Sequence, residues 1–512
     1  MQKESKAQRV ERIKAAKNPL EVLKDIHRYA KNGEIVDDET VDRLKWYGMY
    51  PHNKHSNDDK KSLYMLRIKL PSGKVNLNQL ETLRDISQRF AENRISFTVR
   101  QNVQLHYIKF KNLPELFEML ENVGLTAQMA SGDCPRSIVT CPLSGINDDE
   151  IFDTSEIFSK LNQYFQGNVD YINLPRKYKM GVCGCKNRCL IHEVQDLSFL
   201  AFNDKDKIRF NVYVGGGLGS NKRFSTLLGS IKEEQIISVA SAVTKLFRDF
   251  GNRENRAKAR LGHLIDSMGI LEFQKKLEEL IGFKIEKSDE LQKPLFMKRN
   301  HLGLTKSKNK KSFHIGFKTE SGNIGGVGLE NICNIMKENN IKQIALTTAQ
   351  NFIALDVPSE LVDNLEKDFE NIGFASQPSA FKVRALACTG VEFCKFGVSE
   401  TKELQKSVIS YLEEKFPNFD ENISITFNGC TNSCVHPHLS HIGLIGAKVN
   451  KESGFRLVLG ANMDNGEKEF ARKSDLKASS GEIHLLLEKI VSDYLKEKDK
   501  FKDFNEYLTC LI

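Results

Sequence analysis

The chain has 512 residues, a formal net charge of +8 and eleven cysteines. Its 40% hydrophobic and 28% charged residues are ordinary for a globular protein, which excludes disordered, collagen-like and coiled-coil classes. No stretch approaches the roughly 18 consecutive apolar residues of a membrane span, and the charged N-terminus lacks the apolar core of a secretory signal. We therefore expect a cytoplasmic protein without a membrane span, whose clustered cysteines bind a metal or cofactor rather than form disulfides.

An internal repeat organises the chain. A shift of 249 residues without gaps aligns residues 72–125 with 321–374, and Gln101 and Asn102 then meet Gln350 and Asn351. Matching residues along an ungapped alignment at a single offset indicate that this segment of the chain is duplicated.

Each copy predicts the same succession of elements. It begins with an alternating run (62–70 or 313–318) typical of a half-buried strand, followed by a segment of helical periodicity. Extended residues and a second helix ending at Gly124 or Gly373 complete a βαββα half of ferredoxin-like character.

A longer segment follows each copy, and the two share a landmark. Residues 184–189 read GCKNRC and residues 429–434 read GCTNSC. We therefore predict an α+β fold that is internally duplicated, with two ferredoxin-like half-domains and two larger α/β segments related by a pseudo-twofold axis. The expected divisions are an N-terminal helical and extended arm (1–60), the first half-domain (61–128), the first larger segment (129–290), the second half-domain (305–375) and the second larger segment (376–500).

Four cysteines form the strongest chemical signal. After Cys388 and Cys394, a segment of 35 residues precedes the second pair, Cys430 and Cys434. Two pairs of thiolates suit a [4Fe–4S] cluster. A structural zinc site is the alternative, although zinc ribbons use pairs that are closer in sequence than Cys388 and Cys394.

The sequences ACTGVEFCKFG (387–397) and NGCTNSC (428–434) resemble the signature of the siroheme-dependent nitrite and sulfite reductases. The resemblance extends over about residues 18–489. It implies that Cys388, Cys394, Cys430 and Cys434 bind the [4Fe–4S] cluster, and that Cys434 is also the axial ligand of siroheme iron. It also implies that the two larger segments are the siroheme- and cluster-binding units.

Basic residues in three segments are candidates for binding anions, since arginine pairs with oxyanions and lysine can also supply protons. The resemblance implies that Arg100, Arg136, Lys177 and Lys179 contact the substrate. It also implies that Arg176 pairs with a siroheme carboxylate. Arg100 aligns with Ala349 in the second copy, so this position has diverged between the halves.

Lys177 and Lys179 alternate with Tyr178, which places both lysines on one face of an extended segment. Among proteins of the resembled family, the second position of the pair is typically lysine in sulfite reducers and often asparagine in nitrite reducers. Lys179 therefore favours sulfite.

Two further segments fit an anionic cofactor. The glycines of 214–223 let backbone N–H groups approach an anion, although a tight hairpin is the alternative. Residues 252–264 suggest a basic helix, on which Arg256 or Lys258 could pair with a siroheme carboxylate or simply form a solvated face.

The sequence gives more than one role for five cysteines of the first half: Cys134, Cys141, Cys183, Cys185 and Cys189. They could hold a second metal centre, or they could be relics of the duplication or inert thiols, since no Cys-x5-Cys pair accompanies them.

Together these features predict a reductase that takes sulfite to sulfide by six-electron transfer, with nitrite reduction to ammonia as the alternative. The chain has no evident dinucleotide-binding fingerprint, so electrons must come from a separate carrier. The resemblance implies ferredoxin, an acidic protein that the positive net charge suits. A nucleic-acid-binding metalloprotein is the rival from another class, but the lysines are scattered among acidic residues rather than gathered in a stripe. We expect a monomer that binds no nucleic acid.

Overall fold

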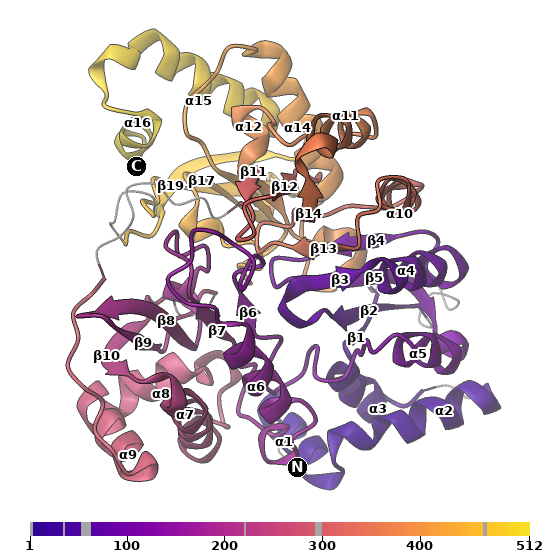
Figure 1. Ribbon diagram of the computed structural model, residues 1–512, viewed down its shortest axis with the longest axis vertical. Coiled ribbons are helices and arrows are strands. Elements are labelled where there is room, and N and C mark those ends of the chain that lie inside the picture. Colours follow the sequence, from indigo (N-terminus) through magenta and orange to yellow (C-terminus); the bar gives the residue numbers. More distant parts are fainter. Residues whose placement is uncertain (1–3, 34–35, 53–62, 220–221, 292–299, 464–467) are drawn as a thin grey trace.

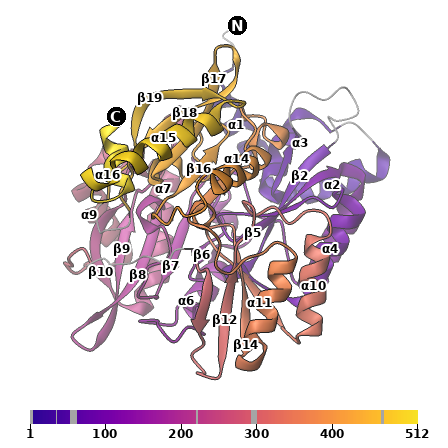
Figure 2. The same cartoon turned by 90° about the horizontal axis from the view of Figure 1, so that it is seen from above.

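The computed structural model describes residues 4–33, 36–52, 63–219, 222–291, 300–463 and 468–512. Its strands form four sheets, and helices lie against each of them. Figure 1 shows the two smaller units one above the other on the right and the two larger units on the left, and Figure 2 gives the view from above. None of the described helices is long and apolar enough to cross a membrane.

The first ferredoxin-like unit has the strand order β1-β2-β5-β4. The alternating run predicted over 62–70 is a strand from Leu63, and residue 62 lies outside the described part. The N-terminal helices α1, α2 and α3 precede this unit. The bounds are α1 (Lys6–Ala16), α2 (Val22–Asn32), α3 (Asp38–Arg43), β1 (Met49–Pro51), β2 (Leu63–Lys69), β3 (Lys74–Asn76), α4 (Leu77–Phe90), β4 (Ile95–Phe97), β5 (Asn102–Lys109) and α5 (Leu113–Glu121).

The second ferredoxin-like unit repeats this pattern and shares one hydrophobic core with the first. Strand β3 leaves the first unit and pairs with β13 of the second, so the two sheets are joined. Helix α10 buries Leu329, Ile332 and Met336, whose helical spacing places them on one face against α4. The bounds are β11 (Gly303–Lys306), β12 (Ser312–Phe317), α10 (Gly328–Glu338), β13 (Gln343–Leu346), β14 (Phe352–Pro358) and α11 (Val362–Asn371).

Repeat-related residues make reciprocal contacts between the two units. Gln101 Nε2 donates to the carbonyl of Leu346 at 3.0 Å, and Gln350 Nε2 donates to the carbonyl of Phe97 at 3.4 Å. Phe97 and Leu346 are themselves related by the 249-residue shift. Both glutamines have a positive φ, 54° and 62°, so even the backbone turn is repeated. The contacts confirm the duplicated, pseudo-twofold fold.

The two larger units also share one topology. In each, three parallel strands are followed by two antiparallel ones, in the orders β6-β7-β8-β9-β10 and β15-β16-β17-β18-β19. The first unit comprises β6 (Val139–Thr140), α6 (Ser155–Phe165), β7 (Met180–Cys183), β8 (Leu197–Asp204), β9 (Lys207–Val214), β10 (Thr226–Ile231), α7 (Ile236–Phe250), α8 (Leu261–Met268) and α9 (Ile270–Ile281). The second comprises α12 (Ala380–Val383), β15 (Ala385–Ala387), α13 (Gly390–Phe393), α14 (Lys402–Lys415), β16 (Ile425–Asn428), β17 (Ile442–Val449), β18 (Glu452–Leu459), β19 (Arg472–Ser479), α15 (Ile483–Glu497) and α16 (Phe504–Cys510).

Candidate active site

The four signature cysteines lie in loops at the carboxyl ends of two parallel strands. Cys388 follows β15, Cys394 follows the short helix α13, and Cys430 and Cys434 follow β16. Cys434 is exposed, and the other three are partly buried. The backbone N–H of Gly429 donates to Cys388 Sγ at 3.1 Å, a contact that stabilises a thiolate. Four convergent soft ligands of this kind fit an iron–sulfur cluster.

The first ferredoxin-like unit contacts the cysteine loop directly. The ring of His106 stacks on Phe393 at 3.9 Å, and Lys402 Nζ donates to Ser96 Oγ at 2.9 Å. Burial lowers the pKa of Lys402 to about 8, while the nearby Cys388 acts to raise it. The sequence interpretation missed Lys402, although a lysine eight residues after Cys394 was a visible signal.

Arg100 lies in the turn between β4 and β5 and points into the first larger unit. Its Nη1 donates to Gln195 Oε1 at 2.9 Å, and its Nη2 donates to the carbonyl of Ser137. Burial and the neighbouring Arg136 lower the pKa of Arg100 to about 9. The buried Nε of Arg100 has no hydrogen-bond partner among the described residues, so one donor is available to a ligand.

Backbone carbonyls accept hydrogen bonds from the guanidinium of Arg136 and fix its position. Its Nε and Nη2 both donate to Gly132 O, at 3.0 and 2.7 Å. Arg67 of β2 donates to the carbonyl of Ala130 at 3.3 Å, beside Arg136. Burial lowers the pKa of Arg67, which also lies within electrostatic range of Cys434. The sequence interpretation missed Arg67, whose signal is an arginine within the otherwise apolar run of β2.

The ring of Tyr178, which lies between Lys177 and Lys179 in the sequence, is buried against Phe247. Burial and Arg260 lower the pKa of Lys177 to about 8, and the nearby Cys434 acts to raise it. Burial, together with Arg100 and Lys177, places the pKa of Lys179 well below its usual value. A pKa of about 8 lets the ammonium group of Lys177 give up a proton near neutral pH.

A buried carboxylate organises these cations. Asp196 has a fully buried side chain and accepts from Arg260 Nε at 3.1 Å and Nη2 at 2.7 Å. Its Oδ2 also accepts from the backbone N–H of Lys179 at 2.7 Å. Asp196 thus fixes the segment that carries Lys179, directly before β7, and partly neutralises the cationic site. Nothing in the sequence pattern pointed to Asp196.

Asp133 is the second buried carboxylate. It pairs with both guanidinium nitrogens of Arg256, at 2.8 and 3.0 Å, and lies 3.8 Å from Arg176 Nη1. Lys14 of α1, whose side chain is fully buried, lies 3.8 Å from the same carboxylate. Lys258 is exposed. Of the two predicted carboxylate partners, Arg256 therefore already pairs with an acid of this chain.

The basic helix predicted over 252–264 is wrong. Residues Arg256–Lys258 form a single 3₁₀ turn, and Arg260 is the N-cap residue of α8. The reason is local: the Asn255 side chain accepts from the backbone N–H of Ala257 and favours a turn over a continuing helix.

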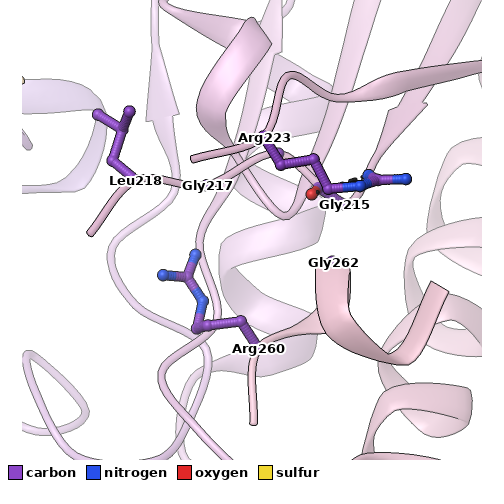
Figure 3. Close-up of a pocket in the computed structure, with 7 residues that line it drawn as sticks. Gly215, Gly217, Leu218, Arg223, Arg260 and Gly262 are labelled. Atoms are coloured by element: carbon purple, nitrogen blue, oxygen red, sulfur yellow. Dashed lines mark hydrogen bonds between the residues drawn. The ribbon is translucent and has the colours of Figure 1, made fainter. Parts of the chain in front are cut away.

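The glycine segment 214–223 lines a pocket together with Arg260, and its residues 220 and 221 lie outside the described part. In Figure 3 the guanidinium of Arg260 points toward Gly217 and Leu218, whereas Arg223 lies alongside Gly215. A Cβ at Gly216 would come within 2.6 Å of two backbone carbonyls, so only glycine fits. A Cβ at Gly219 would lie 3.7 Å from the carbonyl of Asn432, in the loop of Cys430 and Cys434.

The comparisons with known proteins agree with this site. The model of the nitrite and sulphite reductase 4Fe-4S domain matches residues 131–285 and 379–509. The model of the nitrite/sulfite reductase ferredoxin-like half domain matches residues 55–123 and 305–372.

Individual relatives cover nearly the whole chain. A ferredoxin sulfite reductase of Mycobacterium tuberculosis is 30% identical over 526 residues, covering 97% of this chain and 94% of the relative. A ferredoxin–nitrite reductase of Synechococcus elongatus is 30% identical over 87% of this chain and 88% of its own length. The solved structure of the Mycobacterium tuberculosis NirA protein superposes with a TM-score of 0.91 at 30% identity, covering 97% of this chain and 95% of that one.

A duplicated reductase fold around paired cysteines and buried cations thus defines the class of protein. The chain belongs to the nitrite and sulphite reductase family and is an oxidoreductase whose cofactors are siroheme and a [4Fe–4S] cluster. The residues present fit both groups. The cysteine loops offer four thiolates, and the free Nε of Arg100, the cations around it and the glycine segment suit a macrocycle rimmed with carboxylates.

Proposed function

We propose that this protein reduces sulfite to sulfide with electrons delivered by ferredoxin. The observation that carries the proposal is the group formed by Arg100, Arg136, Lys177 and Lys179, whose charges act on one another beside Cys434. A second ammonium at Lys179 suits a doubly charged oxyanion. The similarity to the Mycobacterium tuberculosis ferredoxin sulfite reductase supports the same substrate and donor.

The cofactors would be held by the cysteines and by cations at the rim. Cys388, Cys394, Cys430 and Cys434 would hold the cluster, and Cys434 would also serve siroheme. Arg176 and Lys258 are the proposed partners of siroheme carboxylates. Arg256 is the alternative partner, and its guanidinium already makes a bidentate contact with Asp133. When bound, siroheme and the cluster would pass electrons from the donor to the substrate and would coordinate the substrate through a metal.

The residues of the chain bind the substrate and move protons. The guanidinium groups of Arg100 and Arg136 hold the substrate oxygens, and the carbonyls behind them fix both side chains in place. Departing oxygens leave as water and must be protonated. Lys177 and Lys179 donate those protons, and solvent then reprotonates them. The pKa of Lys177 is about 8.

The test compares kcat/KM for sulfite and nitrite with a chemical reductant. The wild-type enzyme should prefer sulfite, and Lys179→Asn should lower kcat/KM for sulfite about 100-fold, as expected when one proton donor is lost, while affecting nitrite less. Lys160→Asn is the matched control, because Lys160 is an exposed lysine on α6 that pairs with Glu156 at the surface. A wild-type preference for nitrite would overturn the proposal.

The electron donor is expected to be an acidic protein. A net charge of +8 attracts such a partner at long range and raises the rate of encounter.

A further inference from the structure

Four cysteines of the first half meet in the fold. Cys183 Sγ lies 3.4 Å from Cys185 Sγ, and Cys185 Sγ lies 3.5 Å from Cys189 Sγ. Cys141 joins them, since its ligand atom lies within 4.8 Å of that of Cys189. All four are buried. Cys134 is elsewhere, with its thiol 3.0 Å from the carbonyl of Ser131.

The pseudo-twofold relation explains the position of this group. Cys141 follows β6 as Cys388 follows β15, so the two are equivalent. The loop after β7 carries Cys185 and Cys189 at the spacing of Cys430 and Cys434 after β16. Three of the four cluster positions are therefore repeated in the first half.

The fourth position differs between the halves. Cys394, which lies beyond α13, has no counterpart in the first half. Its place in the ligand set is taken by Cys183, the last residue of β7, where the second half has Asn428 at the end of β16. A distant ligand is thus replaced by one only two residues from Cys185, which draws the four sulfurs closer together.

The distances between the cysteine sulfurs match those expected for thiolates bound to one metal ion. With Zn–S bonds of about 2.3 Å, a tetrahedral site has S–S edges of roughly 3.8 Å, close to the 3.4 and 3.5 Å found here. A [4Fe–4S] cube binds each thiolate to a different iron, so its sulfurs lie farther apart. The groups of three or more ligand atoms within 4.8 Å in the described part of the chain include these cysteines but none of the four signature cysteines.

The surroundings suit a closed thiolate site. The side chains around it are apolar, among them Val139, Leu143 and Leu190. The backbone N–H of Cys189 donates to Cys185 Sγ at 3.4 Å, as Gly429 does to Cys388 in the second half. A ring nitrogen of the partly buried His301 lies within 4.8 Å of the sulfurs of Cys141 and Cys189, and its Nε2 has no hydrogen-bond partner among the described residues. Soft ligands in a closed tetrahedral set select Zn²⁺.

We propose that Cys141, Cys183, Cys185 and Cys189 bind one Zn²⁺ ion in a structural site separate from the iron–sulfur cluster. The ion fixes the loop between Cys185 and Cys189, which leads to Leu190 and on to Gln195. Because Gln195 Oε1 accepts from Arg100, the site positions that arginine indirectly. It is a positioning element and takes no part in electron transfer.

The experiment measures metals in the purified holoenzyme and examines the zinc by X-ray absorption. We expect one zinc per chain, in addition to the siroheme iron and four non-haem irons, with four sulfur neighbours at about 2.3 Å. Cys185→Ser should lose the zinc and retain the siroheme absorption. Cys333→Ser, which alters a buried free cysteine of α10, should retain both. Because the absorption measurement needs only the wild-type protein, a variant that does not fold leaves the test intact.

Three outcomes would overturn the proposal. About eight non-haem irons without zinc would indicate a second cube, and one additional iron without zinc would indicate a mononuclear iron site. The absence of both zinc and additional iron from the purified holoenzyme would indicate inert cysteines.

Discussion

Asp196→Asn is the sharpest probe of the cationic site. Asparagine has nearly the shape of aspartate but turns one of its two acceptor oxygens into a donor and removes the charge. Asp196 accepts two hydrogen bonds from Arg260 and one from the backbone of Lys179. After the substitution, at least one of these donors faces an N–H group, and the guanidinium of Arg260, 13% exposed, loses its counterion.

The expected cost follows from this burial. Removing one partner of a buried ion pair costs about 3–5 kcal/mol. For a unit of the size matched over 131–285, about 1 kcal/mol shifts Tm by roughly 2–4 °C, so Tm should fall by about 6–20 °C. Loss of the negative charge also removes an interaction that favours protonated Lys179, so the pKa of Lys179 falls further.

The assay is thermal unfolding of the holoenzyme together with the pH profile of kcat/KM. Asp266→Asn is the control, because Asp266 also pairs with an arginine, Arg223, at 2.9 Å, but its side chain is 51% exposed. An exposed pair contributes about 0–1 kcal/mol, so the control should barely change Tm. Equal Tm shifts for the two variants, with an unchanged pH profile, would refute the reasoning.

Two further predictions concern the proposed proton donor and the shared cysteine. The pKa of Lys177 is about 8 in the chain alone and the cofactor carboxylates raise it, so kcat/KM should decline at pH 8 or above as the ammonium loses its proton. Lys177→Arg keeps its charge and should abolish this decline while lowering kcat about 100-fold; a decline at the same pH in the variant would contradict the assignment. Cys434→Ser should lower turnover by about 100-fold or more and change the siroheme spectrum, whereas Cys510→Ser, at the other exposed cysteine, should do neither. Normal turnover in Cys434→Ser would remove Cys434 from the shared position.

Much of the fold could be predicted from the sequence because duplication and periodicity are local signals. The 249-residue shift identified both ferredoxin-like units. The alternation of Lys177, Tyr178 and Lys179 predicts that Tyr178 faces away from the two lysines, and its ring packs against Phe247. The helix expected over 252–264 failed because one side chain, Asn255, caps a turn there. Periodicity averages over many residues and does not register a single competing hydrogen bond.

The amino-acid sequence by itself determined the family, the duplicated architecture and the four signature cysteines, because each depends on residue type and spacing. Only the tertiary structure decided which charges neutralise one another. Asp133 and Asp196 are ordinary acids in the sequence, and they become counterions of Arg256 and Arg260 only when segments far apart in the chain are packed together. The same holds for the cysteines of the first half. Cys141 is 42 residues from Cys183, and parallel pairing of β6 with β7 brings their strand ends side by side. Distances between side chains from separate strands depend on the register of the sheet, which spacing along the chain does not specify.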